Sequence, residues 1–415
     1  MKAFIAQISK KLGLNNFGPG ILVTAAFIGP GTVITASLAG ANFGLALLWA
    51  LLFAVLSTII LQEMTARLGI VTQQGLGENI RETFSHPVAR GIAILLVVSA
   101  IVIGNGAYQG GNISGASLGL QSIFNSDNAN INQWLWPILI GVIAFMLLWT
   151  GQYRLIEKAL IFLVSLMSLS FLFTFIITQP NLAELFSGLL LPSIPDGATL
   201  TVIALIGTTV VPYNLFLHAS SACQKWKSPD ELPQARKDLY ISIPLGGLIS
   251  IAIVSTAASA FFGKSIAISS AADLAPALQP FFGDSARIFM ACGLFAAGIS
   301  SAVTAPLAAA FALNGMLNLN KSLDDIGFKL IWMLILIIGI VVATSGYKPI
   351  SIIWFAQVAN GILLPIITLY LLWIMNSAKL AKYKNNWKQN ALGFLVLAIT
   401  LMLSGKSLIS AFGKL

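Results

Sequence analysis

Long apolar blocks, separated by short polar stretches, run through the whole 415-residue chain. A block of about 20 apolar residues is long enough to cross the hydrocarbon core of a bilayer as a helix. The blocks predict eleven membrane helices, beginning near residues 18, 45, 89, 134, 156, 197, 239, 286, 328, 350 and 390. Two blocks, 89–121 and 286–317, exceed a plain span, which predicts tilt or extension beyond the membrane.

Two of these blocks contain a proline-centred interruption. The first reads Ile-Gly-Pro-Gly-Thr at 28–32, and the second reads Val-Val-Pro-Tyr-Asn at 210–214. Proline removes a ladder hydrogen bond and clashes with the preceding turn, so the helix opens there. Within a membrane, opened backbone is tolerated only where protein buries it or where it lines a watery cavity. A matching pair of interrupted spans is the sequence signal of a secondary transporter's binding site.

The spacing of the two interruptions predicts an inverted repeat. Pro30 and Pro212 lie 182 residues apart, in spans one and six, so five crossings separate them. The alternative is that prolines are common in membrane helices and that two align by chance. The repeat interpretation predicts one membrane domain over 1–415, with five-helix repeats at 18–178 and 197–376 and an eleventh helix at 389–412.

Composition confirms that the chain is not a soluble domain. Hydrophobic residues make up 57%, charged residues 9%, and the mean hydropathy is +0.89. Soluble domains carry roughly 25% charged residues. The chain is therefore expected to be a multi-pass membrane protein. Cys223 and Cys292 lack the spacing of a disulfide framework or a thiolate metal site.

The net charge of +9 is explained by the expected topology and does not indicate a nucleic-acid partner. With the amino terminus inside, 18 of the 23 Lys and Arg residues fall on the inner side. The outer side receives only Lys264, Arg287, Lys348, Lys406 and Lys414. This asymmetry predicts a cytoplasmic amino terminus and an outer carboxyl terminus, in a bacterial inner membrane.

No nucleophile motif, P-loop or cofactor fingerprint appears on the inner loops. The chain is expected not to be an enzyme or an ATP-driven pump, and to need no cofactor. Its expected partners are a small ion or small-molecule substrate and the lipid bilayer. The sequence does not give the oligomeric state.

Several stretches resemble the Nramp family of metal-ion transporters. They are Gly18–Thr32, Leu47–Trp49, Leu61-Gln62, Ala66–Thr72, Pro212–His218, Gly298–Ser301 and Gln357-Val358. The resemblance covers nearly the whole chain. It implies an all-α fold with the LeuT-type inverted repeat of five plus five helices, an eleventh helix, and spans one and six broken.

The chain departs from the family pattern where the resemblance would place the metal ligands. The family's first break reads Asp-Pro-Gly-Asn, whereas Gly29 and Thr32 stand here. Its sixth-span break reads Met-Pro-His, and the corresponding residues here are Val211 and Tyr213. The resemblance therefore indicates an atypical member without the usual charged and thioether ligands.

The acids of span three show the same departure. The family carries an acidic pair there for proton movement, and the alignment places Gln109 and Asn112 at those positions. These two amides and His218 are the candidate polar pathway. The amides lie on one helix face and could instead hold helices together.

All fourteen acids are predicted to fall in loops or at span ends, with Glu63 and Arg67 forming an interfacial pair. His218 is then the only ionisable group expected in mid-membrane. A lone histidine can be a hydrogen-bonded structural residue or a proton carrier. Weak or absent proton coupling is therefore predicted.

The predicted cargo is a divalent cation. Bringing a bare divalent ion to a site without fixed charge would be very costly. A hard ion such as Mg²⁺ keeps several waters, so it is favoured over Mn²⁺ or Fe²⁺. The alternatives are a neutral or zwitterionic solute such as an amino acid, and a non-transporting or regulatory relative.

The candidate substrate site combines residues of the two breaks with amides of span ten. They are Gly29, Thr32, Thr208, Val211, Tyr213, Asn214, Gln357 and Asn360. Thr32 and Gln357 are the candidate metal ligands. The hydroxyls could instead bond the backbone one turn back, Asn214 could cap its half-helix, and Gln357 and Asn360 could bridge helices.

Overall fold

The computed structural model describes residues 28–84, 86–124, 134–150, 154–264, 268, 270–319, 321 and 323–412. Within these ranges the chain is almost entirely helical. Its α-helices are α3 (Pro30–Phe43), α4 (Leu48–Thr72), α5 (Leu76–Thr83), α6 (Pro87–Ile123), α7 (Leu135–Thr150), α8 (Arg154–Thr178), α9 (Leu182–Leu190), α10 (Thr199–Thr209), α11 (Pro212–Lys225), α12 (Leu232–Phe261), α13 (Gln279–Phe282), α14 (Ala286–Leu317), α15 (Ile326–Ala343), α16 (Pro349–Met375) and α17 (Trp387–Phe412). Short 3-10 segments are η2 (Pro229–Glu231), η3 (Ala272–Ala277), η4 (Gly283–Ser285) and η5 (Ala378–Tyr383).

Nine helices of the described ranges are long and apolar enough to cross a membrane, with α10 and α11 taken as one. The shorter apolar α7 and the described part of span one, α3, complete the eleven predicted positions. The predicted span residues 18–27 lie outside the described residues. The chain is an all-α, multi-pass membrane protein, as its composition predicts.

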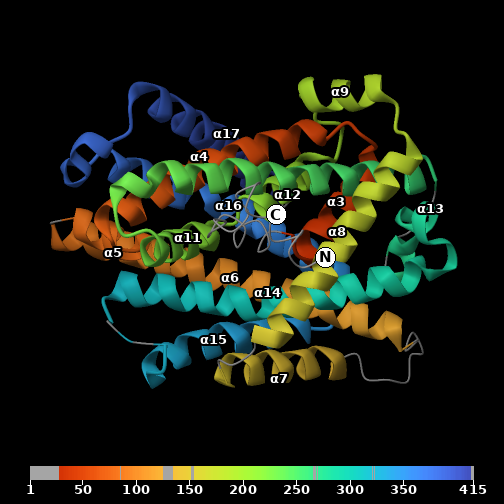
Figure 1. Cartoon of the computed structure of the whole chain (residues 1–415), viewed down its shortest axis with the longest axis horizontal. Coiled ribbons are helices and arrows are strands. Elements are labelled where there is room, and N and C mark those ends of the chain that lie inside the picture. The colour runs from red at the N-terminus through yellow and green to blue at the C-terminus, as the bar shows by residue number, and fades with distance from the viewer. Residues whose placement is uncertain are drawn as a thin grey trace, which may run out of the picture.

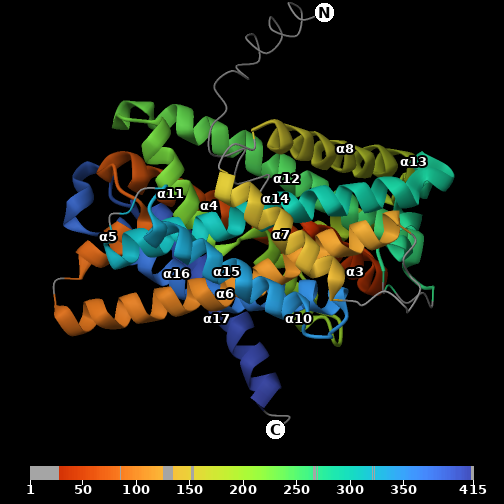
Figure 2. The same cartoon turned by 90° about the horizontal axis from the view of Figure 1, so that it is seen from below.

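The spans run broadly along the long axis of the molecule, with α5 near one end and α13 near the other (Figure 1). The α5 end is the predicted inner end. The helices α6 and α14, both unusually long as their blocks predict, pack along each other, and α15 and α16 also line α6. On the other side α12 packs along α3 and α4, while α17 packs on α16 and its last turns project from the rest (Figure 2).

Small residues set how closely α6 and α14 approach. A Cβ added at Gly298 of α14 would overlap Ala116 of α6, and one added at Gly119 of α6 would overlap the backbone of α14 at Ala291. Because hydrocarbon provides no hydrophobic force between helices, close backbone contact of this kind is a main source of packing energy.

The described backbone shows the predicted break in span six and, for span one, the start of the half-helix after the break. The helix α10 ends at Thr209 and α11 begins at Pro212, and Val210 and Val211 between them leave the helical conformation. In span one, Gly29 is extended (φ −110°, ψ −174°) and Pro30 occupies the first turn of α3. Proline suits this first-turn position because its missing N–H would have no helical partner there.

The structure differs from the sequence prediction at the start of span seven. The prediction places it near residue 239, but α12 begins at Leu232. Just before it, Ser228 and Glu231 cap each other's backbone in a capping box around η2. The capping box favours helix directly after it, so the helix continues beyond the apolar block into a polar extra-membrane segment. The short helices α5 and α9 were not predicted, because neither is long enough to give a span signal.

The predicted pair of Glu63 and Arg67 is confirmed, and it is part of a larger network. Glu63 lies inside α4 and is buried by the protein, and Arg67 is buried beside it. The two Glu63 oxygens accept bonds from Arg67 (3.0 Å) and from Arg236 of α12 (2.8 Å). Arg67 also donates to the Tyr383 carbonyl and to Asn385, both at 2.7 Å. This ion network joins α4, α12 and the α16–α17 connection.

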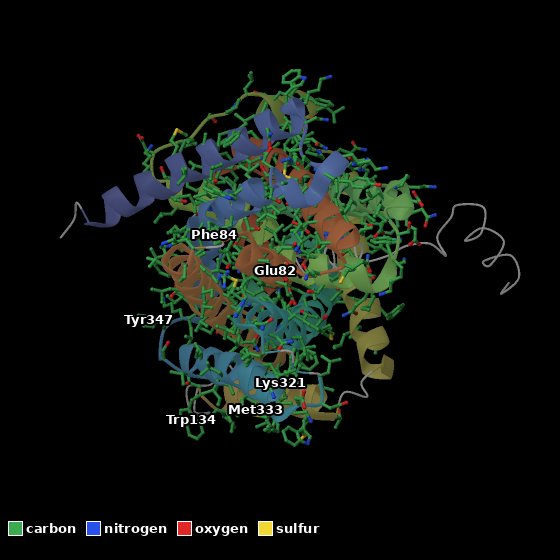
Figure 3. All side chains as sticks on the ribbon, turned by 90° about the vertical axis from the view of Figure 1, so that its left-hand side faces the viewer. Glu82, Phe84, Trp134, Lys321, Met333 and Tyr347 are labelled. Carbon is green, nitrogen blue, oxygen red and sulfur yellow. The ribbon has the colours of Figure 1, made fainter. Side chains whose placement is uncertain are left out.

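A second, more exposed pair lies near the same end. Lys379 donates to Glu82 at 2.6 Å and also bonds Gln74 and Asn79. The bond from Lys379 holds the pKa of the Glu82 carboxyl below its usual range. Burial instead raises the pKa of nearby Glu78. Glu82 and Phe84 appear at this end of the molecule in Figure 3.

Replacing Glu63 is expected to destabilise the protein far more than replacing Glu82. Glu63→Gln leaves the buried Arg67 cation without its counter-charge, which costs about 3 kcal/mol. Glu82→Gln removes an exposed pair worth under about 1 kcal/mol. Thermal unfolding of the two variants in detergent measures the difference. Equal midpoints for both would show that the Glu63 network does not stabilise the fold.

Candidate functional site

The two half-helix breaks are joined by a direct hydrogen bond. Thr32 Oγ1 in the first turn of α3 lies 2.8 Å from Thr208 Oγ1 near the end of α10, and either hydroxyl can donate. Both side chains are buried. The adjacent Thr209 bonds the Leu205 carbonyl one turn back, so here the backbone-bonding alternative holds. The bond places two predicted site residues together at the meeting point of spans one and six.

Gly29 faces two hydroxyl-bearing residues that the sequence analysis did not select. A Cβ built on Gly29 would lie 3.0 Å from Ser301 Oγ of α14 and 3.7 Å from the Tyr108 hydroxyl of α6. Tyr108 also meets Tyr213 of α11 edge-on, with ring centroids 5.3 Å apart. The position where the family pattern has a carboxylate is therefore surrounded by neutral hydroxyl groups.

Sequence signals for these two residues existed. Ser301 lies within the family-like stretch Gly298–Ser301, and Tyr108 precedes Asn112 by one helical turn. Both were missed because serine and tyrosine are ordinary constituents of membrane helices. Their proximity to Gly29 depends on how α6 and α14 pack around span one.

Span ten packs closely on both half-helices. The Gln357 side chain of α16 occupies the space where Gly31 would carry a Cβ, and its backbone carbonyl occupies the corresponding space at Gly207. Gln357 Nε2 donates to the Ile353 carbonyl at 3.3 Å. Gly31 in α3 and Gly207 in α10 therefore let α16 approach closely enough to bring Gln357 to the breaks. A ligand at the breaks would need this proximity.

Several buried polar atoms around the breaks lack a hydrogen-bond partner in the described part of the chain. They are the Tyr213 hydroxyl, both amide atoms of Asn214, Gln357 Oε1, Asn360 Nδ2, Asn105 Nδ2 and His218 Nε2. A buried polar atom without a partner costs about 1–3 kcal/mol. Such atoms are not confined to the predicted site residues, since others lie on Thr35, Ser37, Ser57, Arg67, Ser114 and Ser377, but those at the breaks can bond water or cargo.

His218 has a partner on one ring nitrogen. Its Nδ1 lies 2.7 Å from Gln62 Oε1 of α4. Because a carboxamide oxygen accepts, this bond places the proton on Nδ1 and leaves Nε2 as an acceptor in the neutral ring. Asn214, one turn earlier on α11, carries its unpartnered amide on the same helix face. Val211, in the break itself, is buried, and its backbone carbonyl accepts a bond from the Asn214 backbone N–H at 3.0 Å.

One of the candidate pathway amides of α6 bonds a neighbouring helix. Gln109 Nε2 donates to the Ala302 carbonyl of α14 at 2.9 Å, and Asn112 Nδ2 donates to Gln109 Oε1 on the same helix at 3.5 Å. Gln109 therefore bridges two helices, the alternative that the sequence left open, whereas Asn112 bonds only within α6. Participation in a polar pathway stays a prediction.

The electrostatics of the site are those of neutral groups. Among the described residues, no cluster of three or more His, Cys, Asp or Glu side chains is placed to hold a metal. The buried Glu63 faces its two arginines, and Asp238 of α12 accepts a long bond from Ser242. The oxygens available to a cation at the breaks are hydroxyls, carboxamide oxygens and carbonyls, with Thr32 and Gln357 among them.

Two broken spans that meet within a bundle of membrane helices define a secondary transporter of the LeuT type. The model of the family described as natural resistance-associated macrophage protein-like, Nramp, matches residues 20–410. The chain belongs to the Nramp family.

Relatives of known name resemble the chain over most of its length. A "divalent metal cation transporter MntH" of Acidiphilium cryptum is 28% identical over 370 residues, covering 86% of this chain and 81% of the relative. A protein of the same name from Klebsiella pneumoniae is 26% identical over 412 residues, covering 96% and 95%.

Solved structures share the fold. A manganese transporter of Eremococcus coleocola superposes with a TM-score of 0.76 at 22% identity, covering 95% of this chain and 86% of that one. MhsT, solved with L-phenylalanine, gives a TM-score of 0.64 at 16% identity and covers 95% and 98%. The fold is therefore shared by a manganese transporter and by a protein solved with an amino acid bound.

A methyl group at Gly207 is expected to destabilise the site. Gly207→Ala would push its Cβ into the α16 backbone at Gln357 and Gly361, and overpacking of this kind costs about 1–3 kcal/mol. Gly91→Ala is the matched control, since Gly91 in α6 has nothing within 4 Å of its Cβ position. The control should gain about 0.5–1 kcal/mol from helix propensity.

Thermal unfolding in detergent measures the stability of both variants. If Gly207→Ala is as stable as the unaltered chain while Gly91→Ala behaves as described, α16 does not pack on α10 as closely as the structure indicates.

Proposed function

We propose that this chain is a secondary transporter that carries a hard, partly hydrated divalent cation such as Mg²⁺ through the meeting point of spans one and six. The observation that carries the proposal is the set of neutral, unpartnered oxygen atoms at the breaks, Asn214 Oδ1 and Gln357 Oε1 among them. The names of the MntH relatives and of the Eremococcus coleocola transporter support a divalent metal as cargo.

The chemistry of the oxygens favours a hydrated ion. Stripping a divalent cation of its water without a carboxylate to replace it would cost many kcal/mol. Mg²⁺ dehydrates reluctantly and is usually held with several waters kept. Coordinated waters donate hydrogen bonds, and Asn214 Oδ1 and Gln357 Oε1 are acceptors without a donor in the described residues. The break at Val211 offers no thioether, so a softer ion such as Mn²⁺ gains nothing special there.

Two domain-level proposals accompany this function. Residues 18–178 and 197–376 act as the two inverted repeats of one membrane domain, with 389–412 as the eleventh helix. The chain lies in a bacterial inner membrane with its amino terminus in the cytoplasm and its carboxyl terminus outside, as the distribution of Lys and Arg favours.

An organic solute is the second candidate, and one observation favours it. Asn214 Nδ2 and Asn360 Nδ2 are unpartnered donors within the described residues, and a donor cannot ligate a cation. A zwitterion such as an amino acid could use donors and acceptors together.

Proteoliposomes that enclose a Mg²⁺-sensitive dye test the cargo. Saturable Mg²⁺ entry is expected, and Thr32→Val should weaken it because the hydroxyl bond to Thr208 is lost. Thr344→Val is the control, since Thr344 on α15 bonds only its own helix. Saturable amino-acid flux without any Mg²⁺ flux would reject the cation and establish the organic alternative.

A second experiment tests whether the metal-site geometry of the family persists in this chain. Gly29→Asp with Val211→Met would place a carboxylate beside Ser301 and a thioether in the break, so Mn²⁺ affinity is expected to rise. No gain in binding of any metal would argue that the cavity has been rebuilt for another cargo.

Transport is expected to depend little on protons. His218 is bonded to Gln62 through Nδ1, and the other ionisable groups that the described residues bring to the breaks are the phenols of Tyr108 and Tyr213, which are protonated at neutral pH. Uptake should therefore change little between about pH 6 and about pH 8, the range in which an ordinary histidine titrates. A pH-sensitive dye inside the liposomes should record no cargo-driven acidification. Acidification that His218→Ala abolishes while cargo binding persists would contradict this prediction.

A further inference from the structure

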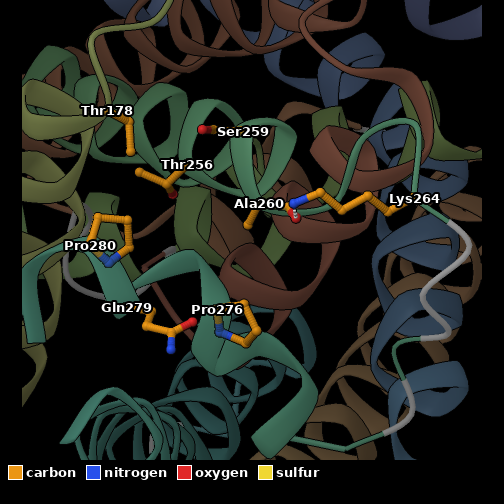
Figure 4. A pocket seen from close by; sticks show the side chains of 8 residues that line it. All are labelled: Thr178, Thr256, Ser259, Ala260, Lys264, Pro276, Gln279 and Pro280. Atoms are coloured by element: carbon orange, nitrogen blue, oxygen red, sulfur yellow. Dashed lines mark hydrogen bonds between the residues drawn. The ribbon is translucent and has the colours of Figure 1, made fainter. Parts of the chain in front are cut away.

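A polar pocket lies at the predicted outer end of the molecule, away from the two breaks. It has a volume of about 380 Å³ and is lined by Thr178, Thr256, Ser259, Ala260, Lys264, Pro276, Gln279 and Pro280. Figure 4 shows the hydroxyl side chains of α8 and α12 on one side, Lys264 on another, and Gln279 and Pro276 opposite. The pocket thus forms where α8, α12 and α13 come together.

The position of the pocket relative to the membrane follows from where two spans end. Thr178 is the last residue of α8, and α12 ends at Phe261, three residues before Lys264. Both helices are apolar enough to cross the membrane. A pocket at the ends of two adjacent spans lies at the level of lipid headgroups, where lysine side chains extend toward the interface.

The lining favours an anion. Lys264 is the only charged residue among the eight, and its ammonium group donates to the Ala260 carbonyl at 2.7 Å, which leaves further protons to donate. Gln279 and Ser259 add an amide and a hydroxyl donor. A phosphate group presents several strong acceptor oxygens, which matches a lining of one cation and several neutral donors.

The surroundings favour a phosphate that carries acyl chains. Phe173 and Ile177 on α8 and Phe281 on α13 are exposed large apolar side chains of two helices that line the pocket, and Ile177 and Phe281 adjoin the lining residues Thr178 and Pro280 in the chain. Phe173 and Phe281 stack with ring centroids 5.5 Å apart, which makes a continuous apolar surface from α8 to α13. Such a surface is continuous with the lipid-facing side of the spans.

We propose that this pocket binds the headgroup of an anionic phospholipid of the outer leaflet, with the phosphate on Lys264 and the acyl chains along Phe173 and Ile177. The lipid bridges α8, α12 and α13. The proposal is independent of the transported cargo, because no residue of the pocket belongs to the candidate substrate site.

The test compares lipid retention by variants of the full chain. The protein is purified from nanodiscs that contain phosphatidylcholine and phosphatidylglycerol, and retained lipid is counted by native mass spectrometry. Lys264→Gln is expected to weaken phosphatidylglycerol retention about fivefold, the effect of one cation on an anionic lipid. Lys264→Arg should restore it. Lys348→Gln is the matched control, since Lys348 is another exposed lysine of the predicted outer side.

A second measurement separates the lipid from a free anion. Phosphatidylglycerol added to the detergent-purified chain should raise its thermal midpoint, and Lys264→Gln should lose that rise. Inorganic phosphate at the same concentration should give none. An equal rise with inorganic phosphate would overturn the lipid assignment, and unchanged retention by Lys264→Gln would overturn the site.

Discussion

The structure depends on how the membrane tolerates two openings in its helices. The backbone freed at Gly29 and at Val210-Val211 cannot face hydrocarbon, so other helices must enclose it. The hydrogen bond between Thr32 and Thr208 brings the two openings together, and glycines let α16 close over both. Enclosing the openings within the bundle also creates the polar interior in which cargo can be held.

The described ion pairs follow the same constraint, because they lie among residues other than those of the two breaks. The buried carboxylate of Glu63 is neutralised by two arginines, five residues along α4 from Thr58, whose hydroxyl donates to the Thr209 carbonyl at the break in span six. Bonds from Arg67 and Lys379 then attach the α16–α17 connection to α4 and α5. Ionic interactions therefore hold the predicted inner end of the molecule, while the described site residues at the breaks, such as Thr32, Thr208 and Gln357, are neutral. Neutral groups of this kind can contact a solute only through their dipoles and hydrogen bonds.

Much of the fold could be predicted because its signals are local. Apolar block length gave the spans, and Pro30 and Pro212 gave the breaks, since each effect acts on the segment that carries it. The start of α12 was missed because the capping of Ser228 and Glu231 extends a helix beyond its apolar block. The burial of Glu63 was missed because Arg236 lies 173 residues away, and only packing brings it to α4.

The candidate site could also be predicted in part, because some of its signals are local to one segment. Thr32, Thr208 and Gln357 could be chosen because a break needs polar partners, yet the hydroxyls of Ser301 and Tyr108 lie on helices without any break. The hydroxyls of Ser301 and Tyr108 matter because they lie near the Cβ position of Gly29. An aspartate there would need room, and Ser301 at 3.0 Å from its Cβ position already occupies part of that room. The absence of an acid at this position and the closeness of α14 are therefore structurally compatible, because the Ser301 hydroxyl lies where part of an aspartate side chain would need space.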